Sequence, residues 1–433
     1  MQFQLFFDYQ SILDSSSFIR KYDALFQAFD LVYTGRDHSQ FGRKGYLKSA
    51  YLKALIYKQS EQIKFTTDLI RDLESRPAIS MLCGFTPGNL PDESQFSRFL
   101  SSTNNSEIEK IMHAAAKMLI DAGHITTDIL IGDSKPIRAN SKQNNPKNPN
   151  RSLDKTRKIR RNPAATLGYY SYLKQASADK KKQFAFFWGY RTHVLVSREG
   201  VVLAEVTKPN SVSDSVAAKS LMRKVKRLYG QKKNRKIILD AAYDSNDIYN
   251  FITETMNSKP FIALNPRYKK PVANFDPQGV PVCDAQLPMK YCGSANEEHR
   301  SRVKYRCPIK AGSKKEQAKL PTECPAGHPL FSQGKCYGCT AYLDLNGDAR
   351  AKIQRQSKRF KDTYALRTEV ERYFSRLGPR EFEDTTLYNY RAIRNQMSIA
   401  HLTLNLVAVA ATIVLKRTDK IRCYKTFADP LAA

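Results

Sequence analysis

The sequence predicts a mixed fold, on the border of the α+β and α/β classes, with helices packed on a mixed five-stranded sheet. Three observations carry this prediction. Apolar residues recur at helical spacing as far as about residue 122. From residue 123 onward, short apolar strands alternate with helical stretches. Between residues 272 and 347, Cys, Pro and Gly replace periodic apolar residues, which indicates a separate insertion.

Residues 1–122 are predicted to form an all-helical, DNA-binding domain. Leu47, Tyr51 and Leu55 follow one another at helical spacing. Pro91 followed by Asp92 is typical of a helix start. Two interpretations stay open, a plain helical bundle and a helix-turn-helix that reads DNA, because helical spacing does not reveal the partner.

The sheet is predicted from a series of short apolar strands. One strand ends at Asp133, and a β-hairpin follows with its turn at residues 197–200. A helix then runs from Asp214 to about Tyr229, and the next apolar strand ends at Asp240. The core that carries this sheet is predicted over residues 123–271 and, after the insertion, over residues 348–433.

A basic loop is predicted over residues 140–183. Residues 140–161 contain eight basic residues and one acidic residue, with little that could be buried. The loop is either a solvated linker or an arm that contacts DNA phosphates. The candidate DNA contacts are Lys155, Arg157, Lys158, Arg160 and Arg161.

Aromatic residues gather in the first strand of the hairpin, at Phe184, Phe186, Phe187 and Trp188. We interpret them as core residues of a strand. Stacking on a flipped base is the alternative.

The charge balance predicts a polyanionic partner. Lys and Arg number 71 against 41 Asp and Glu, a net charge of +30. Such a surplus attracts nucleic acid. The opening residues carry no secretory signal and the apolar stretch at Leu402–Leu415 is short for a membrane span, so it is predicted to be a buried helix. We therefore expect a cytoplasmic, nucleoid-associated protein that contacts no membrane.

Three carboxylates are candidates for metal binding. Asp133 and Asp240 both end apolar strands, and Mg²⁺ prefers carboxylate oxygens. Glu371 lies on a predicted helix, where Tyr364 and Arg367 share its face at helical spacing. The alternatives are a turn or helix-cap role for each Asp and an Arg367–Glu371 surface pair.

Three segments resemble the signature segments of insertion-sequence transposases of the DDE class. They are DSKPIRAN, LDAAYDS and YALRTEVERYFSRL. GYRTHVLV and VTKPNSVSD are similar to further family segments, and residues 45–100 are similar to the helical N-terminal domain common in these transposases. The resemblance covers most of the chain outside residues 141–180 and the cysteine-rich segment.

The resemblance implies a ribonuclease H-like core in which Asp133, Asp240 and Glu371 bind two Mg²⁺ or Mn²⁺ ions. It implies cleavage of double-stranded DNA at element ends and joining of 3′ ends to target DNA. A homodimer is expected on DNA. Tyr364, Arg367 and Arg376 are expected beside the site as accessory residues.

One position departs from the family pattern. The family often has Lys seven residues after the Glu, where this chain has Gly378. Arg376 and Arg380 are the candidate substitutes, and Asp214 and Asp244 are the fallback carboxylates. The alternatives are a catalytically inactive DNA-binding protein derived from a transposase and a nuclease that cuts but never joins.

Six of the eight cysteines lie between residues 283 and 339. Clustered cysteines in a polar, turn-rich segment of a cytosolic protein are typical of structural zinc. A zinc-ribbon-like insertion is therefore predicted over residues 272–347, and the alternatives are unrelated free cysteines and a zinc-dependent transcription factor. The candidate zinc ligands are Cys307, Cys324, Cys336 and Cys339.

Overall fold

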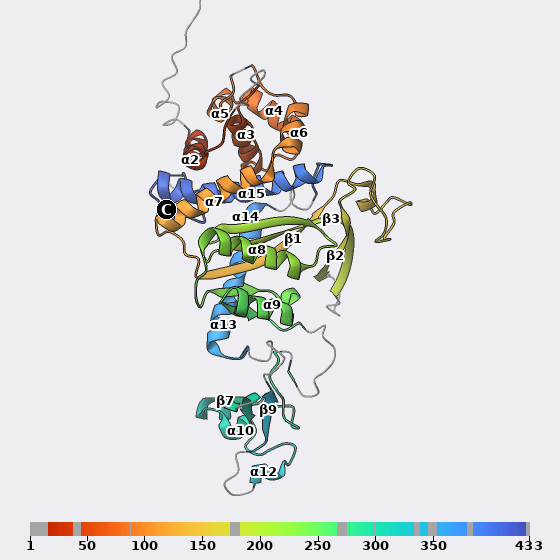
Figure 1. Ribbon diagram of the computed structural model, residues 1–433, viewed down its shortest axis with the longest axis vertical. Coiled ribbons are helices and arrows are strands. Elements are labelled where there is room, and N and C mark those ends of the chain that lie inside the picture. The colour runs from red at the N-terminus through yellow and green to blue at the C-terminus, as the bar shows by residue number, and fades with distance from the viewer. Residues whose placement is uncertain are drawn as a thin grey trace, which may run out of the picture. The chain divides into compact units, whose positions relative to one another are not determined.

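The computed structural model (Figure 1) divides into two compact units. The first unit contains residues 1–230 and 368–433, and the second unit contains residues 231–367. Each unit is described by itself. The structure describes residues 16–37, 45–86, 88–173, 182–265, 275–276, 278–297, 300–332, 338–344, 353–378 and 384–429.

The N-terminal part of the first unit is helical, as predicted. Asp92 begins α6 with a capping box, in which its carboxylate accepts the Gln95 N–H and the Gln95 side chain accepts the Asp92 N–H. Gly84 ends α5 in the left-handed conformation, at a φ of 98°. The helices are α2 (Ser17–Val32), α3 (Lys48–Ser60), α4 (Thr66–Ser75), α5 (Pro77–Cys83), α6 (Glu93–Ser102) and α7 (Asn105–Asp121).

A long apolar helix, α15 (Tyr390–Val409), packs against α7, α6, α3 and β4 (Figure 1). With the π-helical turn that follows, it is long and apolar enough to cross a membrane, yet 89% of its most apolar window is buried inside the protein. The prediction of a buried helix is confirmed. Asn405 on this helix accepts the Val202 N–H and donates to the Val202 carbonyl, both at 2.9 Å, so its buried amide is satisfied.

The first unit contains four antiparallel strands centred on β3. β3 pairs with β1 and β4 through its second half and with β2 through its first half. Helix α8 (Asp214–Tyr229) packs on β3 and β4, and α14 (Thr368–Leu377) contacts β1. The strands are β1 (Ile129–Arg138), β2 (Thr166–Leu173), β3 (Lys182–Val196) and β4 (Val202–Pro209).

Two strand predictions need correction. β1 does not end at Asp133 but continues to Arg138, because residues 133–138 stay paired with β3. The predicted loop over residues 140–183 contains β2, whose Tyr169 lies opposite Phe186 and forms an aromatic cross-strand pair. Position 168 of this strand is a glycine, and a side chain there would collide with Asn210.

The second unit has a parallel pair of strands, β5 (Lys236–Leu239) and β6 (Lys259–Ile262). Helix α9 (Asn246–Asn250) and a π-helical turn connect them. The cysteine-rich segment forms a three-stranded antiparallel sheet around a small core that includes Val303 and Tyr305. Its strands are β7 (Lys290–Glu297), β8 (Arg300–Arg306) and β9 (Thr340–Asp344), and its short helices are α10 (Pro308–Ala311), α11 (Lys314–Gln317) and α12 (Pro329–Ser332).

The predicted single helix around Glu371 is in fact divided. Helix α13 (Lys358–Tyr364) ends in the second unit, a 3₁₀ turn follows at Ala365–Arg367, and α14 then begins in the first unit. The five predicted core strands β1, β3, β4, β5 and β6 are all present, with β2 in addition. The strands and helices follow one another in the predicted order, so the prediction of a mixed sheet with flanking helices is confirmed.

Candidate active site

Asp133 and Glu371 line one cavity of about 370 Å³ in the first unit. Asp133 comes from the middle of β1 and Glu371 from α14, which contacts β1. The Asp133 carboxylate accepts the Ser134 N–H at 2.7 Å and is half-buried, whereas Glu371 is exposed. Two elements far apart in the sequence therefore bring two of the three predicted metal-binding carboxylates to one cavity.

Packing of α14 explains the position of Glu371. The helix buries Val370, Tyr373, Phe374 and Leu377, which recur at helical spacing. Glu371 follows Val370 on the neighbouring face, so its carboxylate stays accessible at the cavity while the helix is fixed by its apolar side. Phe374 and Ser375 complete the α14 side of the lining.

Lys135 lines the same cavity and was missed by the sequence reasoning. Alternation along β1 places it on the same face as Asp133. Its ammonium nitrogen lies 3.5 Å from the Gly378 carbonyl oxygen. Gly378 follows the last residue of α14 at a φ of 100°, where a Lys side chain would be strained. Lys135 would have been a candidate if the strand had been predicted to continue past Asp133, because alternation then places it beside that residue.

Asp240 directly follows β5 in the second unit, as predicted. Its carboxylate accepts the Ala242 N–H at 2.9 Å and caps a short 3₁₀ turn. Tyr364 and Arg367 also belong to the second unit. The structure thus brings Asp133 and Glu371 together within the first unit and presents Asp240 at a strand end of the second.

Arg376, one candidate substitute for the family's Lys, contacts Gly200 and Tyr373 of the first unit. Its guanidinium donates to the Gly200 carbonyl at 3.1 Å and lies 5.9 Å from the centre of the Tyr373 ring. Burial lowers the pKa of Arg376. Arg376 is absent from the lining of the cavity, whose cation is Lys135. Arg380, the other candidate, lies outside the described residues.

The fallback carboxylates are engaged in hydrogen bonds and ion pairs. Asp244 is 1% exposed and accepts from the Tyr249 hydroxyl at 2.9 Å and the Asn265 N–H at 2.8 Å. Asp214 lies 3.4 Å from the Arg191 guanidinium. Burial raises the pKa of Asp214, and Arg191 opposes that rise. Their partners indicate that both residues support the fold.

Cysteines of the second unit meet at β8 and β9. The Cys307 N–H donates to the Cys339 carbonyl at 2.8 Å. Burial, together with the neighbouring thiols of Cys307 and Cys283, raises the pKa of the Cys339 thiol to about 12. Cys324 lies in a turn that the Gly327 N–H closes, and Cys336 lies outside the described residues. In the part of the chain that the structure describes, no three His, Cys, Asp or Glu side chains form a group that could hold a metal ion.

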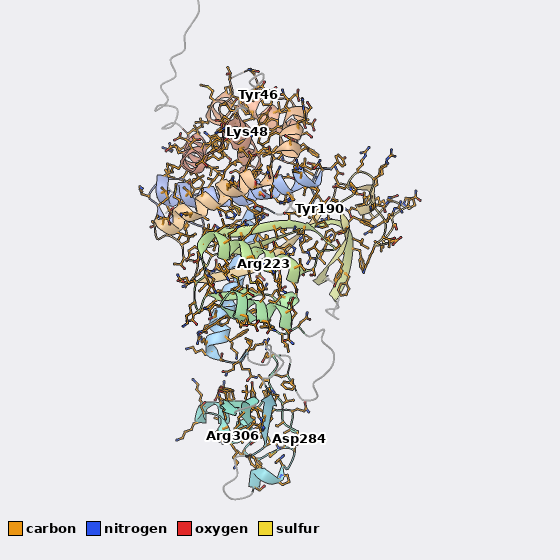
Figure 2. All side chains as sticks on the ribbon, in the orientation of Figure 1. Tyr46, Lys48, Tyr190, Arg223, Asp284 and Arg306 are labelled. Atoms are coloured by element: carbon orange, nitrogen blue, oxygen red, sulfur yellow. The ribbon has the colours of Figure 1, made fainter. Side chains whose placement is uncertain are left out.

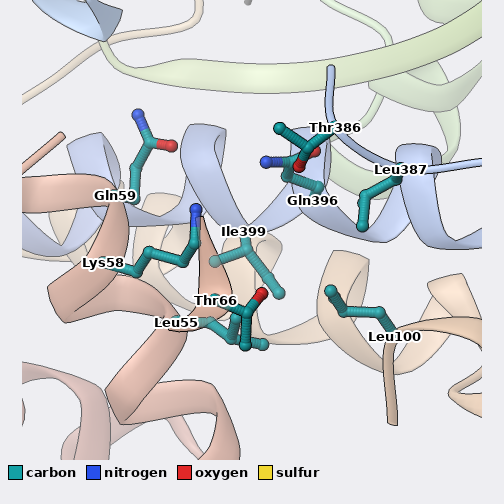
Figure 3. A pocket seen from close by; sticks show the side chains of 9 residues that line it. All are labelled: Leu55, Lys58, Gln59, Thr66, Leu100, Thr386, Leu387, Gln396 and Ile399. Atoms are coloured by element: carbon teal, nitrogen blue, oxygen red, sulfur yellow. The ribbon is translucent and has the colours of Figure 1, made fainter. Parts of the chain in front are cut away.

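A second cavity, between α3 and α15, is much smaller (Figure 3). Its volume of about 20 Å³ suits a single water molecule. The Lys58 side chain reaches into it, and its ammonium donates to the carbonyls of Ile63 at 2.6 Å and Lys64 at 2.9 Å. This buried cation is satisfied by backbone and is part of the helix packing.

Two protein families match this sequence and show the class of protein to which it belongs. Residues 124–406 match the family described as transposase DDE domain, and residues 7–102 match a second family described as a transposase domain. The chain belongs to the transposase DDE domain family. The first match contains both cavity carboxylates as well as Asp240. The second covers the helices α2 to α6, so the helical N-terminal part is a transposase domain as well.

Among solved structures, this DDE-domain chain is similar to a piggyBac transposase in a cryo-EM structure of its synaptic complex with hairpin DNA. The TM-score is 0.40 at 10% sequence identity, and the likeness covers 94% of this chain and 79% of the other. The comparison with curated proteins gives no match.

Proposed function

We propose that this transposase cleaves DNA at the ends of a mobile element and joins the 3′ ends to target DNA. The observation that carries the proposal is the shared cavity of Asp133, Glu371 and Lys135. Two carboxylates and one ammonium around a cavity suit a phosphodiester, because metal binding and charge neutralisation dominate phosphoryl transfer.

The donor set fits Mg²⁺ or Mn²⁺. Asp133 and Glu371 offer carboxylate oxygens to an accessible cavity, and we propose that they hold two such ions together with Asp240. Bound metal would supply charge stabilisation for the attacking and leaving oxygens. The chain's own contribution is to fix the carboxylates on a paired strand and a packed helix.

Lys135 is proposed to bind a phosphate oxygen of the DNA strand at the cavity. Its position two residues from Asp133 places its ammonium beside the carboxylates. A Lys in this place neutralises charge without needing the bidentate geometry of Arg. Tyr364 and Arg367 stay proposed as accessory DNA contacts of the second unit.

Double-stranded DNA is the proposed partner, and a homodimer on DNA and a cytoplasmic, nucleoid-associated location stay predictions. The β1–β2 loop, residues 139–165, supports the DNA partner, because its candidate phosphate contacts are all exposed. They are Lys155, Arg157, Lys158, Arg160 and Arg161. The net charge of +30 favours the same partner.

The test is Mg²⁺- or Mn²⁺-dependent cleavage and joining of DNA that carries the gene's own flanking sequence. Glu371→Gln is expected to lower cleavage at least about a thousandfold while DNA binding persists. Glu93→Gln, at an exposed carboxylate of α6, is the matched control and should cut like the wild type. If the wild type binds and never cuts with either metal, the inactive DNA-binding protein becomes the better description. Cleavage without joining would indicate a nuclease.

A structural zinc ion in the second unit stays a prediction. It rests on the cysteines clustered in this segment of the sequence, and Cys283 joins the candidate ligands because its thiol neighbours that of Cys339. Zinc content of the purified protein, measured by atomic emission, should be one ion per chain and should fall in Cys307→Ser and Cys283→Ser. Cys423→Ser, in the first unit, is the control. A metal-free wild type, or zinc retained in both variants, would show that these cysteines are simply free thiols.

A further inference from the structure

The hairpin of β2 and β3 exposes three aromatic rings on one face. Tyr169 is 43% exposed, Phe184 52% and Phe186 43%. The ring centres of Tyr169 and Phe184 are 5.8 Å apart, and those of Tyr169 and Phe186 are 6.0 Å apart. We call these three residues the aromatic face. Their mutual contacts hold the rings in place before any partner arrives.

The aromatic face lies on the same side of the sheet as the catalytic candidate Asp133. Residues that are directly opposite in antiparallel strands share a face, and so do residues two apart along a strand. Tyr169 is opposite Phe186, and Asp133 is opposite Val194. Even-numbered residues of β3 from 184 to 194 therefore lie on one face of the sheet, exposed at Phe184 and Phe186 and buried from Trp188 to Val194.

The middle of β3 anchors the basic β1–β2 loop. The Trp188 indole N–H donates to the Ser152 carbonyl at 2.9 Å, and the Tyr190 hydroxyl donates to the Asn162 side chain at 2.8 Å. Arg151 of the loop donates to the Phe186 carbonyl at 2.7 Å. Tyr190 is marked in Figure 2. These bonds keep a strongly cationic loop beside the exposed rings.

Exposed rings beside fixed cations fit one class of partner. Nucleobases stack on aromatic side chains when they are unpaired, while neighbouring Lys and Arg bind the phosphates of the same strand. Base pairs inside a duplex hide their faces in the stack and cannot use such rings. A second protein copy would instead have to cover a face whose surroundings carry Arg151 and the loop's exposed basic residues.

We propose that the aromatic face stacks on unpaired bases of a DNA strand whose backbone is held by the β1–β2 loop. The proposal rests on the proposed function, because it takes DNA as the substrate. It adds the form of that DNA: a locally unpaired strand at the hairpin, rather than continuous duplex.

The test compares binding of single-stranded and duplex DNA, each of about 20 nucleotides, by fluorescence anisotropy in EDTA so that cleavage plays no part. The variant Phe184→Ala/Phe186→Ala is expected to bind the single strand about tenfold to a hundredfold more weakly and the duplex as the wild type does. The slope of log affinity against log salt should stay unchanged, because no cation is removed. Phe186→Trp should keep the wild-type affinity for the single strand.

Phe65→Ala is the matched control, because Phe65 is 48% exposed in the same unit and has the Lys64 ammonium 5.4 Å from its ring centre. The proposal is wrong if the double variant binds single-stranded DNA like this control, or if single strand and duplex lose affinity equally. Sedimentation without DNA tests a second copy as the occupant. If the wild type is a dimer and the double variant a monomer, the aromatic face binds a second copy and the proposal is wrong. The wild type could fail to cleave DNA in any assay while the double variant still loses single-strand binding selectively. That result would contradict the proposed function and support the aromatic face as a site for single-stranded DNA.

Discussion

Acidic residues near strands have opposite surroundings in two places, at Asp133 and Glu371 of the first unit and at Asp244 of the second. In the first unit, Asp133 and Glu371 line an accessible cavity beside Lys135. In the second unit, Asp244 lies four residues after Asp240 and is 1% exposed, with Tyr249 and Asn265 bound to its oxygens. Arg355 lies 3.9 Å away and is itself buried. Both arrangements place a carboxylate after or within a short apolar strand, which is what the sequence shows.

This difference teaches that the burial of a carboxylate, and not its place after a strand, separates a candidate catalytic residue from a structural one. A buried carboxylate whose oxygens already accept hydrogen bonds stabilises its surroundings and offers little to a ligand. An accessible carboxylate in a cavity is available to metal or substrate. The three predictions below test that distinction, beginning with the largest effect.

Asp244→Asn should lower the free energy of unfolding by about 3 kcal/mol, because it removes the negative charge of Asp244 beside the buried Arg355 guanidinium. Thermal or urea unfolding measures the loss. Asp247→Asn, at an exposed carboxylate three residues further on, is the control and should change stability little. Below its unfolding temperature, Asp244→Asn should still cleave DNA. An inactive variant with unchanged stability would mean that Asp244, and not Asp240, is the catalytic carboxylate.

Much of the fold could be predicted because its signals are local. The helix start at Asp92 and the helix from Asp214 to Tyr229 depend on neighbours within a few residues, and both were predicted correctly. β1 beyond Asp133 was missed because SKPIR contains a proline and charged residues, which disfavour a strand. Its pairing comes from β3, more than fifty residues away in the sequence.

The candidate site was predictable only in part, for the same reason. Asp133 and Glu371 were found from their sequence segments, and the cavity that joins them depends on the packing of α14 on β1. Lys135 went unnoticed because the strand that orients it was predicted to have ended. The 3₁₀ turn that divides α13 from α14 contains neither Gly nor Pro, so the sequence carries no local signal for it.

Lys135→Ala should lower kcat/KM for DNA cleavage about tenfold to a hundredfold, because the transition state loses one hydrogen bond to a charged group. The slope of log DNA affinity against log salt should become shallower by about 0.9, as expected for the loss of one phosphate contact. Lys135→Arg should recover part of the activity. Lys117→Ala, at an exposed lysine of α7, is the control for general loss of charge. If Lys135→Ala and Lys117→Ala behave alike, the cation at the cavity has no special role.

The smallest effect concerns His401, a buried polar group of the first unit. It tests whether burial has the same consequence in the first unit as it has for Asp244 in the second. His401 is fully buried between the hydroxyls of Thr192 and Tyr373, and burial lowers its pKa to about 3. In the unfolded chain the pKa of His401 returns to about 6.5. Below that pH the unfolded state binds a proton that the folded state does not, which stabilises the unfolded state. Stability should therefore fall by about 1.4 kcal/mol per pH unit between about pH 6 and pH 4 on account of this histidine.

His401→Gln should show a shallower decline over that range than the wild type, measured by urea unfolding at each pH, even though its stability at neutral pH is lower. His124, a partly exposed histidine after α7, provides the control His124→Gln, whose decline should match the wild type. Equal slopes for all three proteins would mean that His401 is protonated in the folded state. Burial would then not decide the behaviour of polar groups in this fold, and the distinction between Asp244 and the cavity carboxylates would lose its physical basis.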